Sequence, residues 1–166
     1  MKKILLIGVI LLIAFLQTGW AQEKTVSPQL SSLLSGYYGV KDALISGNAA
    51  VVVTKANEFI TAATTVNAKS LPKAAQQAYT PLADKLVAEA TAIASVKDIA
   101  QQREHFKGFS NDFYQLAKAV PLSNVPIYQE YCPMQKAYWL SSSNAVKNPY
   151  YGKQMLSCGK VTDIIQ

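Results

Sequence analysis

The chain has 166 residues, half of them apolar and 16% charged, which supplies one folded core and excludes a disordered or collagen-like protein. Its 16 basic and 10 acidic residues give a net charge of +6, and no three basic residues stand in a row. This thin spread of charge does not indicate a nucleic-acid-binding protein.

The N-terminal segment has the pattern of a secretory signal peptide. Two lysines precede the apolar residues 4–16, a stretch shorter than the roughly 20 residues that span a membrane. Small residues then indicate a cleavage site after Ala21. We expect residues 1–21 to be removed and residues 22–166 to form a single exported domain that is soluble in the periplasm and does not span the membrane. An uncleaved N-terminal anchor is the alternative.

Four amphipathic helices are predicted between residues 27 and 120. Apolar side chains recur there at alternating spacings of three and four, which is the period of one helical face. Ser27 and Pro28 open the first helix, and Pro121 ends the fourth. The breaks between the helices are Gly47-Asn48, Ser70-Leu71-Pro72 and Ser95-Val96-Lys97-Asp98, the last of which resembles a capping box.

These helices predict an all-α, up-and-down four-helix bundle, because short links force neighbouring helices to run antiparallel. Pro81 has no backbone N–H, so we expect it in the first turn of the third helix or at a kink. The run Val51-Val52-Val53 would also suit a strand, but the long helical period around it favours a helix.

Residues 121–166 differ in character from the predicted bundle and are called the hook below. They hold four of the seven prolines, both cysteines and five of the nine tyrosines, and the helical period disappears. Residues 125–131 and 160–165 have the composition of short strands, and residues 148–152 that of a turn. We expect an irregular hook, or a short hairpin, that folds back on one end of the bundle.

The hook concentrates sulfur in four residues, Cys132, Met134, Met155 and Cys158. In an oxidising compartment, an even number of cysteines favours a disulfide between Cys132 and Cys158. Closing a loop of that length would stabilise the fold by roughly 3.5 kcal/mol in the chain-entropy model.

The same four residues also suit a soft-metal site. Thiolate and thioether sulfur prefer Cu(I) or Ag(I) to hard cations, because both the ion and its ligand are polarisable. Cys132 and Met134 would share one side of an extended segment, and Met155 and Cys158 would share a face if their segment were helical. The disulfide and the metal site exclude each other at any instant, and both remain open.

Two further side chains are candidates for that metal site. Trp139 could cover the ion with its ring face. His105, the single histidine of the chain, could supply a nitrogen ligand and is the weaker candidate.

The sequence does not favour an enzyme. One histidine and few acidic residues leave little for acid–base chemistry, and no serine sits in a nucleophile elbow. Phosphate-binding glycine loops and haem-attachment sequences are absent as well. Glu104-His105 does not have the Glu-x-x-His spacing of a di-iron bundle.

Several strings of the chain are similar to a Bacteroidetes-type periplasmic domain family of unknown function. Residues 38–44 and 102–106 resemble its helical part. The more specific similarity lies in the hook, in Tyr131-Cys132-Pro133-Met134, Tyr138-Trp139-Leu140-Ser141, Asn148-Pro149-Tyr150-Tyr151-Gly152 and Met155-Leu156-Ser157-Cys158-Gly159. In that family the domain occurs alone or attached to adaptor subunits of copper and silver efflux systems, so the resemblance implies a role in heavy-metal handling.

The leading hypothesis is a periplasmic accessory protein that binds Cu(I) or Ag(I) and serves heavy-metal efflux or homeostasis, with an efflux adaptor as its partner. The alternative is a disulfide-stapled helical interaction module with no metal role.

Overall fold

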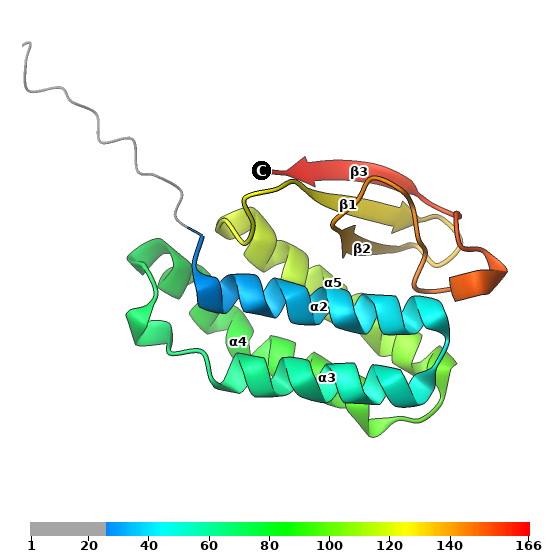
Figure 1. The fold of residues 1–166 in the computed structure, drawn as a ribbon, viewed down its shortest axis with the longest axis horizontal. Helices are drawn as coiled ribbons and strands as arrows, with labels where there is room; N and C mark the ends of the chain where they lie inside the picture. The colour runs from blue at the N-terminus through cyan, green and yellow to red at the C-terminus, as the bar shows by residue number, and fades with distance from the viewer. Residues whose placement is uncertain (1–25) are drawn as a thin grey trace, which may run out of the picture.

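The structure of the chain is a computed structural model that describes residues 26–166 (Figure 1). The predicted signal peptide, residues 1–21, lies outside the described residues. The elements are α2 (Pro28–Ser46), α3 (Ala49–Thr64), the short 3-10 helix η2 (Ala68–Ser70), α4 (Lys73–Ser95), α5 (Ile99–Ala119), β1 (Ile127–Cys132), β2 (Ala137–Ser141), the 3-10 helix η3 (Gly152–Gln154) and β3 (Lys160–Ile165). Over residues 26–166, no helix combines the length and apolar character needed to cross a membrane.

The turn between α2 and α3 forms at the predicted break. Gly47 ends α2 in the left-handed conformation, with a φ of 77° that glycine adopts without steric cost. The side chain of Asn48 accepts hydrogen bonds from the backbone N–H groups of Ala50 and Val51, at 3.1 and 3.2 Å, and so begins α3. The valine run is therefore helical, as its period predicted.

The break between α4 and α5 is built differently from the predicted capping box. Ser95 is the last residue of α4, and the N-cap of α5 is Asp98. The Asp98 carboxylate accepts a hydrogen bond from the backbone N–H of Gln101 at 2.9 Å. The backbone at Val96 is extended, so the chain leaves α4 there and α5 starts anew at Asp98. Asp98 is thus itself the N-cap residue, instead of the acidic partner of a serine N-cap.

Pro81 lies inside α4, beyond its first turn. The helix begins upstream of it at Lys73, and buried side chains secure this first part. Tyr79 is buried, and its hydroxyl donates to the carbonyl oxygen of Ala63 on α3 at 3.0 Å. This packing offsets the backbone hydrogen bond that proline cannot make.

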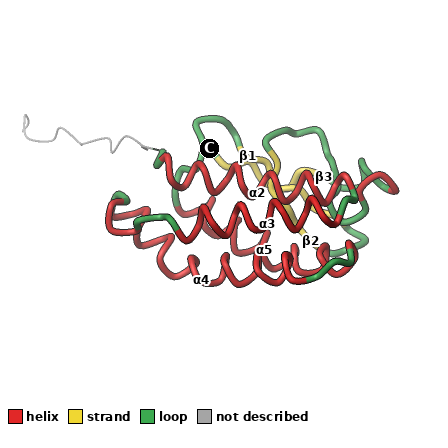
Figure 2. Tube along the Cα trace, turned by 60° about the horizontal axis from the view of Figure 1, so that its bottom comes forward, coloured by secondary structure: helices red, strands yellow, loops and turns green. Residues whose placement is uncertain are grey.

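The four helices form the predicted antiparallel bundle, in which each helix packs against the next in the chain (Figure 1, Figure 2). Aromatic rings fill its centre. Tyr37 of α2 lies against Phe106, Phe109 and Phe113 of α5, with ring centroids 5.5, 5.5 and 4.7 Å apart. Phe59 of α3 meets Phe109 edge-on at 4.7 Å. All five rings are fully buried, so the predicted apolar stripes form the core.

The hook is a three-stranded antiparallel sheet, which corrects the all-α prediction. The strand order is β2-β1-β3, with β1 in the centre, and the sheet lies over α5 and α2 (Figure 1). The predicted strands at 125–131 and 160–165 correspond to β1 and β3, whereas β2 was not predicted. Aromatic and β-branched residues fill these strands and suit a pleated surface with buried positions.

Tyr37 joins the sheet to the bundle through its buried hydroxyl. That hydroxyl lies 2.7 Å from the Oγ of Ser110 on α5 and accepts a hydrogen bond from the backbone N–H of Leu140 at 2.9 Å. Burial raises the pKa of Tyr37 well above the usual tyrosine value, so the phenol stays neutral. The sheet is therefore bonded to the bundle at the centre of the core.

Candidate functional site

The β1–β3 pairing brings the two cysteines together. Tyr131 pairs with Lys160, which places the last residue of β1, Cys132, beside the segment that leads into β3. Cys132 and Cys158 come within 4.4 Å of each other, and both are free thiols. The sequence predicted this meeting of two remote segments, and the antiparallel sheet produces it.

The two thiols differ in exposure. Cys132 is fully buried, whereas Cys158 is partly exposed. Partial burial and the neighbouring sulfur of Cys132 raise the pKa of the Cys158 thiol. At neutral pH Cys158 is therefore a protonated thiol, and a metal ion that binds there has to displace a proton.

The two methionines lie in the loops next to the cysteines. Met134 is in the turn between β1 and β2 and is 60% exposed, and Met155 follows η3 and is 36% exposed. The backbone N–H of Cys158 donates to the carbonyl of Met155 at 3.1 Å, so this segment is a turn rather than a helix. We call the region of Cys132, Met134, Met155 and Cys158 the sulfur end.

A cleft of about 320 Å³ lies beside the sulfur end, between α5 and the hook. Gln135 and Gln154 both line this cleft. Because they are the sequence neighbours of Met134 and Met155, the two methionine-bearing loops border the same cleft. The structure thus brings Cys132 and Cys158 together, and it places Met134 and Met155 in the loops that border this cleft.

Asn148 holds the loop before Cys158 in place. Its side-chain amide donates to the carbonyl oxygen of Cys158 at 2.6 Å and accepts from the backbone N–H of Tyr150 at 2.8 Å. Its backbone N–H donates to the carbonyl of Leu156 at 2.7 Å, and its own carbonyl accepts from Gly152 at 2.9 Å. Asn148 is fully buried, so these bonds fix the position of Cys158 from inside the hook.

Trp139 covers the segment between Cys158 and β3. Gly159 has a φ of 151°, and a Cβ there would lie 2.8 Å from the Trp139 ring and 3.0 Å from the carbonyl oxygen of Tyr131. Only glycine fits this approach. The fully buried indole therefore packs on the backbone next to Cys158.

Glu130 is a buried acid that the sequence analysis missed. It is fully buried, and neither carboxylate oxygen has a hydrogen-bond partner among the described residues. Burial raises the pKa of Glu130 to about 7. The Lys41 ammonium, the Trp139 indole and the backbone N–H of Lys147 each lower it somewhat, but neither N–H reaches hydrogen-bond geometry. An acid in a run of strand residues gave no signal for this burial.

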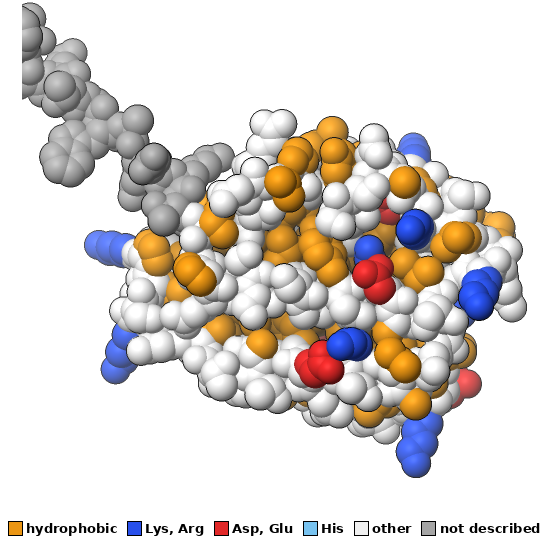
Figure 3. Space-filling model, in the orientation of Figure 1, with side chains coloured by type: hydrophobic (Ala, Val, Ile, Leu, Met, Phe, Trp, Pro, Cys, Tyr) orange, Lys and Arg blue, Asp and Glu red, His pale blue; other side chains and the backbone are white. Residues whose placement is uncertain are grey.

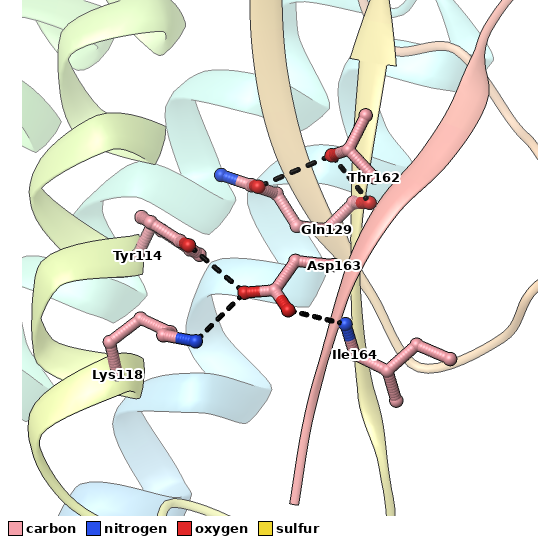
Figure 4. Close-up of polar contacts among 6 residues, drawn as sticks. All are labelled: Tyr114, Lys118, Gln129, Thr162, Asp163 and Ile164. Carbon is pink, nitrogen blue, oxygen red and sulfur yellow. Dashed lines mark hydrogen bonds and ion pairs between the residues drawn. The ribbon is translucent and has the colours of Figure 1, made fainter.

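The last strand is fastened to α5 by Asp163 (Figure 4). Its carboxylate accepts hydrogen bonds from the Tyr114 hydroxyl at 3.0 Å and from the Lys118 ammonium at 2.9 Å. Nearby, the Thr162 hydroxyl donates to the backbone carbonyl and to the side-chain oxygen of Gln129, each at 3.2 Å. These contacts hold the half-buried strand β3, and with it the segment of Cys158, against the rest of the molecule.

His105 is not part of the sulfur end. It lies beside Glu89 of α4, where its charge lowers the pKa of a carboxyl that burial and Asp112 raise. Among the described residues, no hydrogen bond or ion pair links His105 to either cysteine. Residues 26–166 also contain no group of three or more His, Cys, Asp or Glu that could hold a metal ion. The candidate donors that the structure brings together are therefore the two thiols, with the thioethers of Met134 and Met155 in the neighbouring loops.

Comparison with known proteins gives one result. A family model for a protein of unknown function (DUF3347) matches residues 33–124, which comprise most of the bundle and end before β1. No curated protein and no solved structure matches the chain.

Proposed function

The chain belongs to the family of proteins of unknown function DUF3347, and from the chemistry of its sulfur end we propose that it is a periplasmic accessory protein that binds Cu(I) or Ag(I). The observation that carries this proposal is the approach of Cys132 and Cys158 to within 4.4 Å. Metal–thiolate bonds are about 2.3 Å long in zinc sites, so thiols this close can bind one ion of similar size between them.

The donor set favours a soft monovalent ion. Two thiolates and nearby thioethers are the ligands that Cu(I) prefers, and oxygen ligands suit hard cations instead. Cys158 and the two methionines are reachable from solvent, while Cys132 supplies a ligand from the interior. We propose that the bound ion is cargo, received or delivered in the periplasm, and that an adaptor subunit of a heavy-metal efflux system is the acceptor.

A competition titration tests the metal proposal. The reduced protein is titrated with Cu(I) under anaerobic conditions against a chromogenic Cu(I) chelator. We expect one ion per chain. Binding should weaken by at least about a hundredfold in the Cys132→Ser/Cys158→Ser variant, because the loss of outer-shell partners alone costs about 10- to 100-fold and this variant loses both thiolate ligands. Met134→Leu/Met155→Leu should weaken it less, because thioethers are neutral ligands. Equal affinity in wild type and the double serine variant would refute the proposal.

The same proximity supports the second candidate, a disulfide-stapled interaction module. Free thiols this close can form a disulfide if either side chain moves toward the S–S bond length of about 2.05 Å. Intact mass of protein freshly isolated from the periplasm, with and without reductant, decides between them. A mass that is lower by two hydrogens before reduction than after it shows a disulfide. If the reduced protein also binds no Cu(I), the disulfide-stapled module is favoured.

A further inference from the structure

The exposed surface of the hook is positively charged. Among the described residues, four exposed lysines of the hook have no ion-pair partner: Lys136, Lys147, Lys153 and Lys160. The two acidic residues of the hook do not compensate, because Glu130 is fully buried and Asp163 pairs with Lys118. In Figure 3, several basic side chains lie on the right of the visible face, where Figure 1 places η3 and the beginning of β3.

Two of these lysines flank the cleft beside the sulfur end. Lys136 follows Gln135 and Lys153 precedes Gln154, and both glutamines line the cleft. From α5 the cleft receives Arg103 and Lys107. Its single acidic lining residue, Glu104, is already paired with Lys107 at 2.7 Å. Arg103 has no ion-pair partner among the described residues, so the lining of the cleft has a net positive charge, and the exposed Lys136 and Lys153 adjoin its hook side in the sequence.

The other lining groups suit a peptide. The amides of Gln135 and Gln154 can donate to and accept from a peptide backbone, and Tyr150 and Tyr151 add ring surface. A volume of about 320 Å³ accommodates a few side chains. Met134 and Met155, the sequence neighbours of the lining Gln135 and Gln154, are exposed and add apolar surface to the two loops.

We infer that this cleft docks an acidic segment of a partner protein, which places the partner's own ligands next to the sulfur end. The inference rests on the proposed function, since it names the chemistry of the protein that exchanges the metal ion. Complementary charge would steer the two proteins together and fix their relative orientation. A lipid surface fits less well, because the groups that would recognise it line a cleft between α5 and the hook, and because Trp139, the tryptophan of the hook, is fully buried.

Fluorescence anisotropy with a labelled acidic peptide tests the inference. The probe alternates acidic residues with methionine, and its neutral counterpart carries asparagine and glutamine in place of aspartate and glutamate. We expect the metal-free protein to bind the acidic probe and not the neutral one. Affinity should fall as salt rises, since exposed charges are screened. The Lys136→Glu/Lys153→Glu variant should bind at least about fivefold more weakly, as two exposed charge contacts are reversed.

The matched control is Lys69→Glu/Lys73→Glu. These exposed lysines lie near Ser70, which bonds to Gln29 where α2 begins. The 3-10 helix η3 instead packs where α2 ends, since Gly152 lies against the carbonyl oxygens of Leu44 and Ile45. The control should bind the acidic probe like wild type. Equal loss in both variants would reveal unspecific charge attraction and overturn the inference, as would absence of binding. Binding to phosphatidylglycerol vesicles but not to the peptide would assign the surface to a membrane and overturn it too.

The Cu(I) titration and the peptide titration together separate the two proposals, and the Cys132→Ser/Cys158→Ser variant shows whether the cleft binds the probe without the thiols. If the sulfur end binds no Cu(I) but the cleft still binds the acidic probe, only the metal proposal is wrong. If Cu(I) binds and the probe does not, only the docking cleft is wrong.

Discussion

Glu130 on β1 stands directly opposite Trp139 on β2, and the buried polar atoms of both side chains lack hydrogen-bond partners among the described residues. The pair lies two residues along β1 from Cys132, so it shares the face of the sheet that carries the buried thiol. A carboxyl in this setting is buried more easily in its neutral form than in its charged form.

Glu130 should make the metal-free protein less stable as the pH rises from 5 to 8. Its pKa is about 7 in the folded chain and near 4.5 when unfolded, so the folded state holds the proton more tightly. The contribution of the protonated Glu130 to the free energy of unfolding is fully present below pH 4.5 and is lost as the pH rises through 7. The total loss is up to about 3 kcal/mol. Urea unfolding at both pH values measures it. Glu130→Gln should remove most of the difference, whereas Glu58→Gln, at an exposed site, should leave it unchanged.

Tyr37→Phe should destabilise the protein by about 2 kcal/mol. The ring remains, but the backbone N–H of Leu140 and the hydroxyl of Ser110 lose their buried partner. Chemical denaturation compares this variant with Tyr128→Phe, whose hydroxyl has no hydrogen bond within residues 26–166. Equal stability of the two variants would show that the buried hydroxyl does not hold the sheet on the bundle.

Asp163→Asn should loosen β3 selectively. The variant loses the charge that holds Lys118 and Tyr114, so the amides of β3 should exchange hydrogen faster while those of α2 keep their rate. The Lys118 and Tyr114 contacts lower the pKa of Asp163, so this clamp is present at neutral pH and is lost as the pH falls through that lowered pKa. Glu58→Gln, which breaks the ion pair with Lys55 on α3, is the control.

Asn148→Ala should make the loop that carries Cys158 more mobile. The substitution removes the donor to the Cys158 carbonyl and the acceptor for the Tyr150 N–H, both at buried positions, and should cost about 2–3 kcal/mol. Mass spectrometry measures the rate at which a thiol reagent modifies Cys132. This rate should rise by more than the lower free energy of global unfolding alone would cause. An unchanged rate of Cys132 modification would show that Asn148 does not keep the pair closed.

The helical half of the fold was predictable because local rules decide it. Stripes of apolar residues at helical spacing, the Gly47-Asn48 break and the prolines at each end all act within a few residues. The structure differs from the helix prediction in two places, at the N-cap Asp98 of α5 and at Pro81 inside α4. At both places more than one local arrangement satisfies the same sequence pattern. Packing decides there, as the bond from Tyr79 to α3 illustrates.

The sheet and the site were predictable only in part. β1 and β3 have strand composition, but β2 carries three buried residues in succession, Trp139, Leu140 and Ser141, so it lacks the alternation of a half-buried strand. The meeting of the cysteines was a prediction from composition, and the register between β1 and β3 supplied the reason. Glu130 had no signal, since the burial of a lone acid depends on the loop and helix that cover it.

The bond from Leu140 to Tyr37 has a consequence for how the molecule melts. A polypeptide cut after residue 124, where the family match ends, would leave the most central phenol without its backbone donor and Phe106 without the ring of Tyr150. Helices and strands should therefore unfold in a single cooperative transition, and the strands complete the interior that the helices only begin.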